Sequence, residues 1–150
     1  MASTLAGRQG TVAPPGAPVR RRKALAAVAA ATAAGAWGGA AGLATGTLNL
    51  GAQVTGRLPF ASPVFGAAAL TAIVAVPFTV LATLAWKADR RAALAAVAAG
   101  ALLVGWIAVE LAFIRSVSFL QPFYLLVGAS FVLVGRREVR RRLRPLARSR

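Results

Sequence analysis

Side chains able to donate or accept protons are scarce in this chain. Its 150 residues include three carboxylates, Asp89, Glu110 and Glu138, against 18 lysines and arginines, with no histidine and no cysteine. Histidine is the commonest general base and metal ligand, and cysteine supplies thiolate nucleophiles. We therefore predict no catalytic residue, no metal ligand and no bound cofactor, and we expect the chain not to be an enzyme.

Glu110 is the carboxylate with the strongest claim on function, because it interrupts a long uncharged stretch that also holds Trp106 on the same helix face. Ionisable side chains within membrane spans are costly and often mark ion or proton pathways. Arg115 could supply a counter-charge and Gln121 could face the carboxylate, so these three residues form a candidate polar site. The favoured alternative is a Glu–Arg pair that anchors the helix end, since Glu110 is only about 6 Å from that end.

Long apolar segments must position these residues. The composition is 58% hydrophobic and 14% charged, and the charges are clustered between uncharged stretches. A helix needs about 20 apolar residues to cross a bilayer. We therefore predict an all-α polytopic membrane protein, a four-helix transmembrane bundle over residues 20–140, with spans at about 24–48, 63–86, 92–114 and 118–135.

The second span has a clear start and an interruption. Ser62 followed by Pro63 is typical of an N-cap and a first helical position. Pro77 lies within the span and predicts a kink rather than a break, because neighbouring helices can stabilise it. Hydroxyl groups in the span could line a polar path, but they more often bond to their own helix backbone. The threonines concerned are Thr71, Thr79 and Thr83.

The basic residues predict the orientation. Five lysines and arginines precede the first span, three separate the second from the third, and eight follow the fourth, whereas each remaining connection has one. Short cytoplasmic segments are enriched in these residues. We therefore expect a multi-pass protein of the cell (plasma) membrane with both termini cytoplasmic. The alternative, in which residues 1–46 are a cleaved signal peptide, leaves the orientation of the other spans unchanged.

The two terminal segments differ in composition. Residues 1–19 are rich in Gly, Pro, Ser and Thr, which predicts a disordered cytoplasmic tail, and residues 136–150 form a basic one. Basic tails attract anionic lipid headgroups by about 1 kcal/mol per residue. We therefore expect membrane lipids as partners, although a simple stop-transfer anchor is the favoured interpretation. Because the basic residues flank apolar spans, nucleic acid is not an expected partner.

The first span repeats small residues at four-residue spacing. Such spacing lets two helix backbones approach closely. We predict a packing face, more readily inside the bundle than between copies of the chain. The glycines of this predicted face are Gly35, Gly38, Gly39, Gly42 and Gly46.

Two segments at the predicted outer face carry a resemblance. Residues 58–66 (LPFASPVFG) and 113–124 (FIRSVSFLQPFY) resemble those of small four-span membrane proteins of actinobacteria. The resemblance covers about residues 20–140 and implies the four-span fold without an activity. Small multidrug resistance transporters also have four spans, but their essential glutamate lies in the first helix, where this chain has no acid.

These observations favour one function and leave a second open. A third function, that of an enzyme of lipid or quinone metabolism, is the least favoured because acid/base and metal-binding residues are so scarce. The favoured function is that of a structural or accessory four-span inner-membrane protein, which packs as a homo-oligomer or within a larger membrane complex. The alternative is a small transporter or channel subunit with an outer-face site made by Glu110, Arg115 and Gln121.

Overall fold

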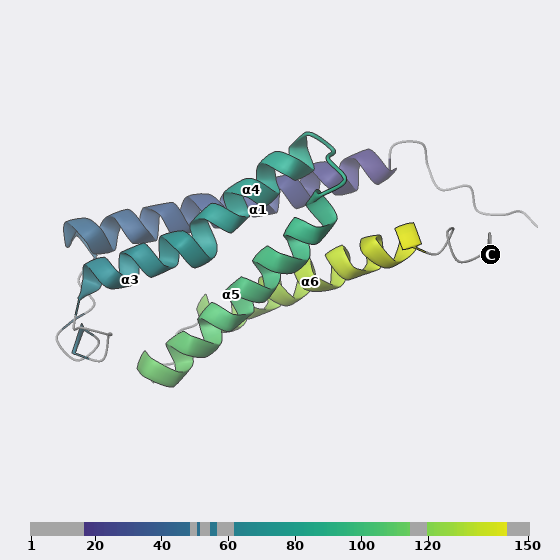
Figure 1. Cartoon of the computed structure of the whole chain (residues 1–150). Coiled ribbons are helices and arrows are strands. Elements are labelled where there is room, and N and C mark those ends of the chain that lie inside the picture. The colour runs from purple at the N-terminus through teal and green to yellow at the C-terminus, as the bar shows by residue number, and fades with distance from the viewer. Residues whose placement is uncertain (1–16, 49–50, 52–54, 57–61, 115–119, 144–150) are drawn as a thin grey trace, which may run out of the picture.

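The protein is all-α, as predicted. The computed structural model describes residues 17–48, 51, 55–56, 62–114 and 120–143, and within these ranges it has no strand. The helical elements are α1 (Ala17–Thr45), α3 (Pro63–Leu70), the π-helical turn η2 (Thr71–Ala75), α4 (Val76–Trp86), α5 (Ala92–Ile114) and α6 (Leu120–Leu143) (Figure 1).

Three of the described helical segments are long and apolar enough to cross a membrane. They are Val19–Thr45, Pro63–Trp86 and Ala92–Ala112. The uncharged part of α6 runs only from Leu120 to Gly135, which is shorter than the roughly 20 residues that a span needs. Residues 118–119 of the fourth predicted span lie outside the described residues. The described residues thus provide three such helices, where the sequence predicts four spans.

The helix ends differ from the predicted limits for local reasons. α1 begins at Ala17, so residues 17–19 are helical rather than part of a tail, and residues 1–16 lie outside the described residues. It ends at Thr45 because Gly46 adopts a left-handed φ of 72°. The backbone N–H of Leu48 then donates to the Gly42 carbonyl at 3.0 Å, which satisfies the helix end. α6 continues through Arg136 to Leu143, into the predicted basic tail.

The second apolar segment is helical throughout, and a π-turn accommodates its proline. The predicted N-cap is confirmed, because the Phe65 N–H donates to the Ser62 hydroxyl at 3.3 Å. Pro77 has no N–H, and its ring would clash with a carbonyl in the preceding turn of a regular α-helix. In η2 the Val76 N–H donates to the Thr71 carbonyl, five residues back. This wider turn lies just before the proline, in the part of the span where the sequence predicts a kink.

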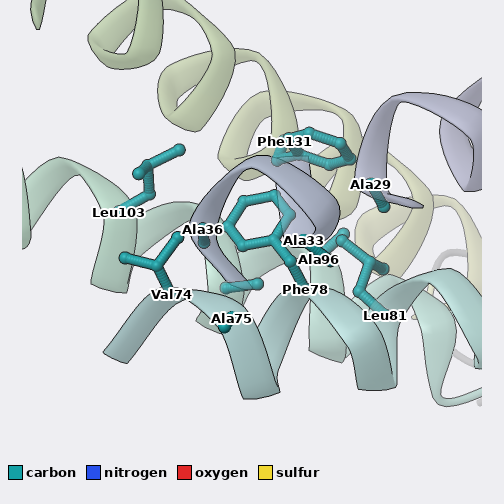
Figure 2. Close-up of a cluster of buried hydrophobic side chains, with 11 residues drawn as sticks. Ala29, Ala33, Ala36, Val74, Ala75, Phe78, Leu81, Ala96, Leu103 and Phe131 are labelled. Atoms are coloured by element: carbon teal, nitrogen blue, oxygen red, sulfur yellow. The ribbon is translucent and has the colours of Figure 1, made fainter. Parts of the chain in front are cut away.

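The helices form two hairpins. α1 packs along α3, η2 and α4, and α5 packs along α6. The two hairpins meet chiefly where η2 and α4 contact α5. Phe78 of α4 and Phe131 of α6 join them, with ring centroids 5.2 Å apart and an edge-to-face angle of 83° (Figure 2). Small side chains of α1, among them Ala29 and Ala33, pack against these rings.

The backbones of α5 and α6 approach each other closely in the second hairpin. A Cβ on Gly100 would lie 2.6 Å from the Gly128 carbonyl oxygen, and a Cβ on Gly135 would lie 2.7 Å from the Ala93 carbonyl oxygen. Ala93 and Gly100 are seven residues apart, as are Gly128 and Gly135. A seven-residue repeat corresponds to two turns, and it is typical of helices that cross at a small left-handed angle.

The glycines predicted as a packing face in α1 have varied surroundings. A Cβ on Gly35 would lie 3.5 Å from the Tyr124 hydroxyl, and one on Gly39 would lie 3.3 Å from a Leu70 methyl. The side chain of Leu48, which follows the helix, covers Gly42. A Cβ on either of the remaining two would meet nothing within 4 Å: Gly38 and Gly46.

Candidate functional site

Glu110, the carboxylate of the candidate polar site, is bonded within its own helix. The indole Nε1 of Trp106 donates to its Oε1 at 2.7 Å. The two residues are one turn apart on α5, a spacing at which side chains meet. Glu110 is half-buried. Its predicted counter-charge, Arg115, lies outside the described residues.

Gln121, the third residue of the predicted polar site, is buried, with 8% of its surface exposed. It lies seven residues before Gly128, which contacts Gly100 across the antiparallel pair of helices. The same register places Gln121 level with Ile107, in the turn of α5 next to that of Glu110. The structure therefore brings Gln121 and Glu110 to the same end of the second hairpin.

Two of the three predicted threonines of the second span bond to their own helix. The Thr79 hydroxyl donates to the Ala75 carbonyl at 2.7 Å, and the Thr83 hydroxyl donates to the Val80 carbonyl at 2.8 Å. Thr79 also accepts a hydrogen bond of 3.2 Å from the indole nitrogen of Trp37, so it links α4 to α1. These bonds link α4 to α1 or satisfy the helix backbone.

A second site, which the sequence did not single out, lies at the other end of the bundle. It is a cavity of about 460 Å³ between the start of α1, the turn that joins α4 to α5, and the last turns of α6. We call it the basic pocket. Its charged lining residues are Arg21, Arg22, Asp89, Arg137, Glu138 and Arg141.

The helical repeat explains which residues line the basic pocket. Val134, Arg137, Glu138 and Arg141 follow one another at intervals of three, one and three residues, and so occupy one face of α6. In Figure 1 the start of α1, the α4–α5 turn and the end of α6 lie at the same end of the molecule. Three segments that are distant in sequence thus contribute to one cavity.

The floor of the basic pocket is apolar, in contrast to its charged residues. Leu25 of α1, Ala85 of α4, Ala96 of α5 and Val134 of α6 contribute to it. Ala96 also belongs to the buried core, so the floor adjoins the packed centre of the bundle. The cavity is therefore amphipathic: charged groups at the helix ends adjoin apolar side chains toward the core.

The charges of the basic pocket do not balance. Four guanidinium groups face two carboxylates, an excess of two positive charges. Asp89 accepts a hydrogen bond of 2.7 Å from the Arg91 backbone N–H, at the turn that starts α5, which holds its carboxylate at the helix start. Guanidinium groups bind phosphate and carboxylate through paired hydrogen bonds. The arrangement can therefore hold an anion.

Sequence reasoning missed this pocket, although part of its signal was present. The basic clusters were interpreted as markers of orientation. That interpretation depends on the number of lysines and arginines in a segment, and not on which positions they occupy. The spacing of Val134, Arg137 and Arg141 on one helix face was visible. That this face meets Arg21 and Arg22 depends on how two hairpins pack, which spacing within one helix does not specify.

No family model, curated protein or solved structure matches the chain. The class that the structure itself defines is an all-helical chain with three described helices able to cross a membrane. Function must therefore be inferred from the residues of the two sites.

Proposed function

We propose that this chain is a four-span protein of the cell membrane, with both termini cytoplasmic, that acts as an accessory component and catalyses no reaction of its own. The observation that carries the proposal is the convergence of basic segments. Arg21 and Arg22 near the start, and Arg137 and Arg141 near the end, line one cavity together with the α4–α5 turn. Basic residues gathered at one end of a membrane bundle favour the cytoplasmic side.

The packing of α6 supports the fourth crossing. α6 runs antiparallel to α5, with Gly135 against Ala93 and Gly128 against Gly100. Because α5 is long and apolar enough to cross, a helix packed along it in the opposite direction returns to the first side. Arginine side chains can extend from a short span toward the lipid headgroups, and the bilayer can thin locally, so the limited apolar length of α6 is tolerated.

The hydrogen bonds within the spans support an accessory role. A transport route needs polar groups that face a shared water-filled path. Here Trp106 bonds Glu110 within α5, and Trp37 bonds Thr79 between α1 and α4. Polar groups engaged in this way stabilise the bundle. We expect the protein to act by packing against copies of itself or against a larger membrane complex.

Transport is the second candidate, because Glu110 is a half-buried carboxylate within a span-length helix. The test is proton and cation flux into proteoliposomes that contain the purified full chain. For an accessory protein, wild type and Glu110→Gln give the same flux as protein-free liposomes. A flux that requires the protein and disappears in Glu110→Gln would instead establish a transporter.

A further inference from the structure

We propose that the basic pocket binds the phosphate group of an anionic phospholipid, with the lipid's apolar part against the pocket floor. The inference rests on the proposed function, since a bilayer lipid reaches this cavity only if the surrounding helices cross the membrane. It gives the site a defined ligand class, and it assigns the binding to four arginines from two helices: Arg21, Arg22, Arg137 and Arg141.

The placement of charge is the first reason. Arg21 and Arg22 on α1 share one cavity with Arg137 and Arg141 on α6, and two carboxylates leave an excess of two positive charges. Like charges held near one another repel, and an anion placed among them removes that repulsion. A phosphate diester has one negative charge and several oxygens that accept guanidinium hydrogen bonds.

The first turn of α5 adds to this field. Ala92 and Ala93, its first two residues, line the basic pocket. The amino end of a helix carries a partial positive charge and free N–H groups, both of which favour an anion. Asp89 occupies part of this end, because its carboxylate accepts from the Arg91 N–H and its backbone carbonyl accepts from the Ala92 N–H at 3.2 Å. The helix end therefore supports the arginines and does not form a site alone.

The apolar floor indicates a lipid as the source of the phosphate. Leu25, Ala85, Ala96 and Val134 lie below the charged residues. Ala85 and Ala96 are buried, but Leu25 is partly exposed and Val134 is 40% exposed, so inorganic phosphate, or any small hydrophilic phosphate, would leave these two side chains uncovered. A phospholipid places its phosphate at the charged end and its glycerol and first methylenes on the floor. Basic pockets between membrane helices on the cytoplasmic side are suited to such headgroups.

The test compares two pairs of substitutions that remove the same charge from the same helix. Arg137→Gln/Arg141→Gln removes two arginines that line the pocket. Arg136→Gln/Arg140→Gln removes two arginines that do not line the pocket; all four arginines are exposed, so the pairs differ only in whether they line it. The full chain is purified in neutral detergent and titrated with short-chain phosphatidylglycerol or phosphatidylcholine, and binding is followed by the shift in thermal unfolding.

We expect wild type to bind phosphatidylglycerol in preference to phosphatidylcholine. The pocket pair should weaken phosphatidylglycerol binding about tenfold or more, and the control pair less than about threefold. An equal loss in both pairs would overturn the pocket, because it would show attraction to a basic surface only. A second pair of variants on α1 serves if one of the α6 variants folds poorly. It compares Arg21→Gln/Arg22→Gln, which line the pocket, with Arg20→Gln/Lys23→Gln, which do not.

Glycerophosphoglycerol, the soluble phosphodiester without acyl chains, separates the two sources of phosphate. We expect it to compete poorly with phosphatidylglycerol at equal concentration. Equal competition would overturn the lipid assignment and indicate a site for free phosphate esters. Labelling of a cysteine placed at Ser149 reports the side of the C-terminus, so a failure of the four-span topology is distinguished from a failure of the pocket.

Discussion

Ala88 has the most constrained backbone among the described non-glycine residues. It is the only one of them with a positive φ, 55°, and it follows the last turn of α4. The Asp89 N–H donates to the Leu84 carbonyl at 2.9 Å, and the Ala88 N–H donates to the Ala85 carbonyl at 3.2 Å. These two bonds form a helix end that usually contains glycine, because an L side chain is strained in this conformation.

Ala88→Gly should therefore stabilise the protein by about 1 kcal/mol. The measurement is the free energy of unfolding in mixed micelles. Ala101→Gly is the matched control, because Ala101 is exposed in the middle of α5 and the same change there should cost about 1 kcal/mol. A loss of stability in both variants would contradict the strained conformation at Ala88.

The sequence indicates some residues of the two candidate sites and misses others for physical reasons. Glu110 stands out because a carboxylate in an apolar stretch is costly, and its spacing from Trp106 places both on one helix face. The arginines of the basic pocket do not stand out, because each belongs to a cluster of similar residues. Arg137 and Arg141 line a cavity shared with α1 and the α4–α5 turn, whereas Arg136 and Arg140 do not, and this difference appears only once the two hairpins are docked.

At the scale of elements, α5 and α6 pack closely at three glycines. Gly128 and Gly135 are spaced to match Gly100 and Ala93 on the antiparallel partner. The four-residue glycine spacing in α1 predicts a packing face. In the structure, however, a Cβ on Gly38 would meet nothing within 4 Å. The spacing of small residues shows where another helix could pack closely against a backbone. It does not show whether a helix packs there, or which one.

Gly100→Ala should cost about 2 kcal/mol, because the added methyl group would overlap the backbone of α6 and force the helices apart. Gly105→Ala, on the same helix, is the control. A Cβ there would meet nothing within 4 Å, and the higher helix propensity of alanine should leave stability unchanged or raise it by up to about 1 kcal/mol. Both are measured as unfolding free energies. Equal effects would show that α5 and α6 are not in close contact at Gly100.

At the scale of the whole molecule, one buried cluster contains residues of both hairpins and holds them together. Phe78 is fully buried and meets Phe131 edge to face, beside the alanines of α1 (Figure 2). Ser62 and Pro63 allowed the start of the second span to be predicted. Gly46, predicted as part of a packing face, instead ends α1 at Thr45, before the predicted limit at residue 48. The docking of one hairpin on the other could not, because it depends on side chains far apart in sequence.

A double-mutant cycle tests this contact. Phe78→Ala and Phe131→Ala should each cost about 3 kcal/mol, because each leaves a cavity in the core. The double variant should cost about 1 kcal/mol less than the sum, the energy typical of an aromatic pair. Phe123→Ala is the control, since Phe123 is 54% exposed and its loss should change stability little. Full additivity of the two core substitutions would contradict a direct contact between the hairpins.

The side of the membrane on which each connection lies tests the four-span topology most directly. The chain has no cysteine, so single substitutions introduce unique labels: Thr55→Cys, Ala88→Cys, Ser116→Cys and Ser149→Cys. Intact spheroplasts are treated with an impermeant maleimide, with and without prior permeabilisation. Four crossings with cytoplasmic termini predict labelling of the first and third variants in intact spheroplasts, and of the other two only after permeabilisation. Labelling of Ser116→Cys and Ser149→Cys from the same side would show that α6 does not cross, and would contradict the topology.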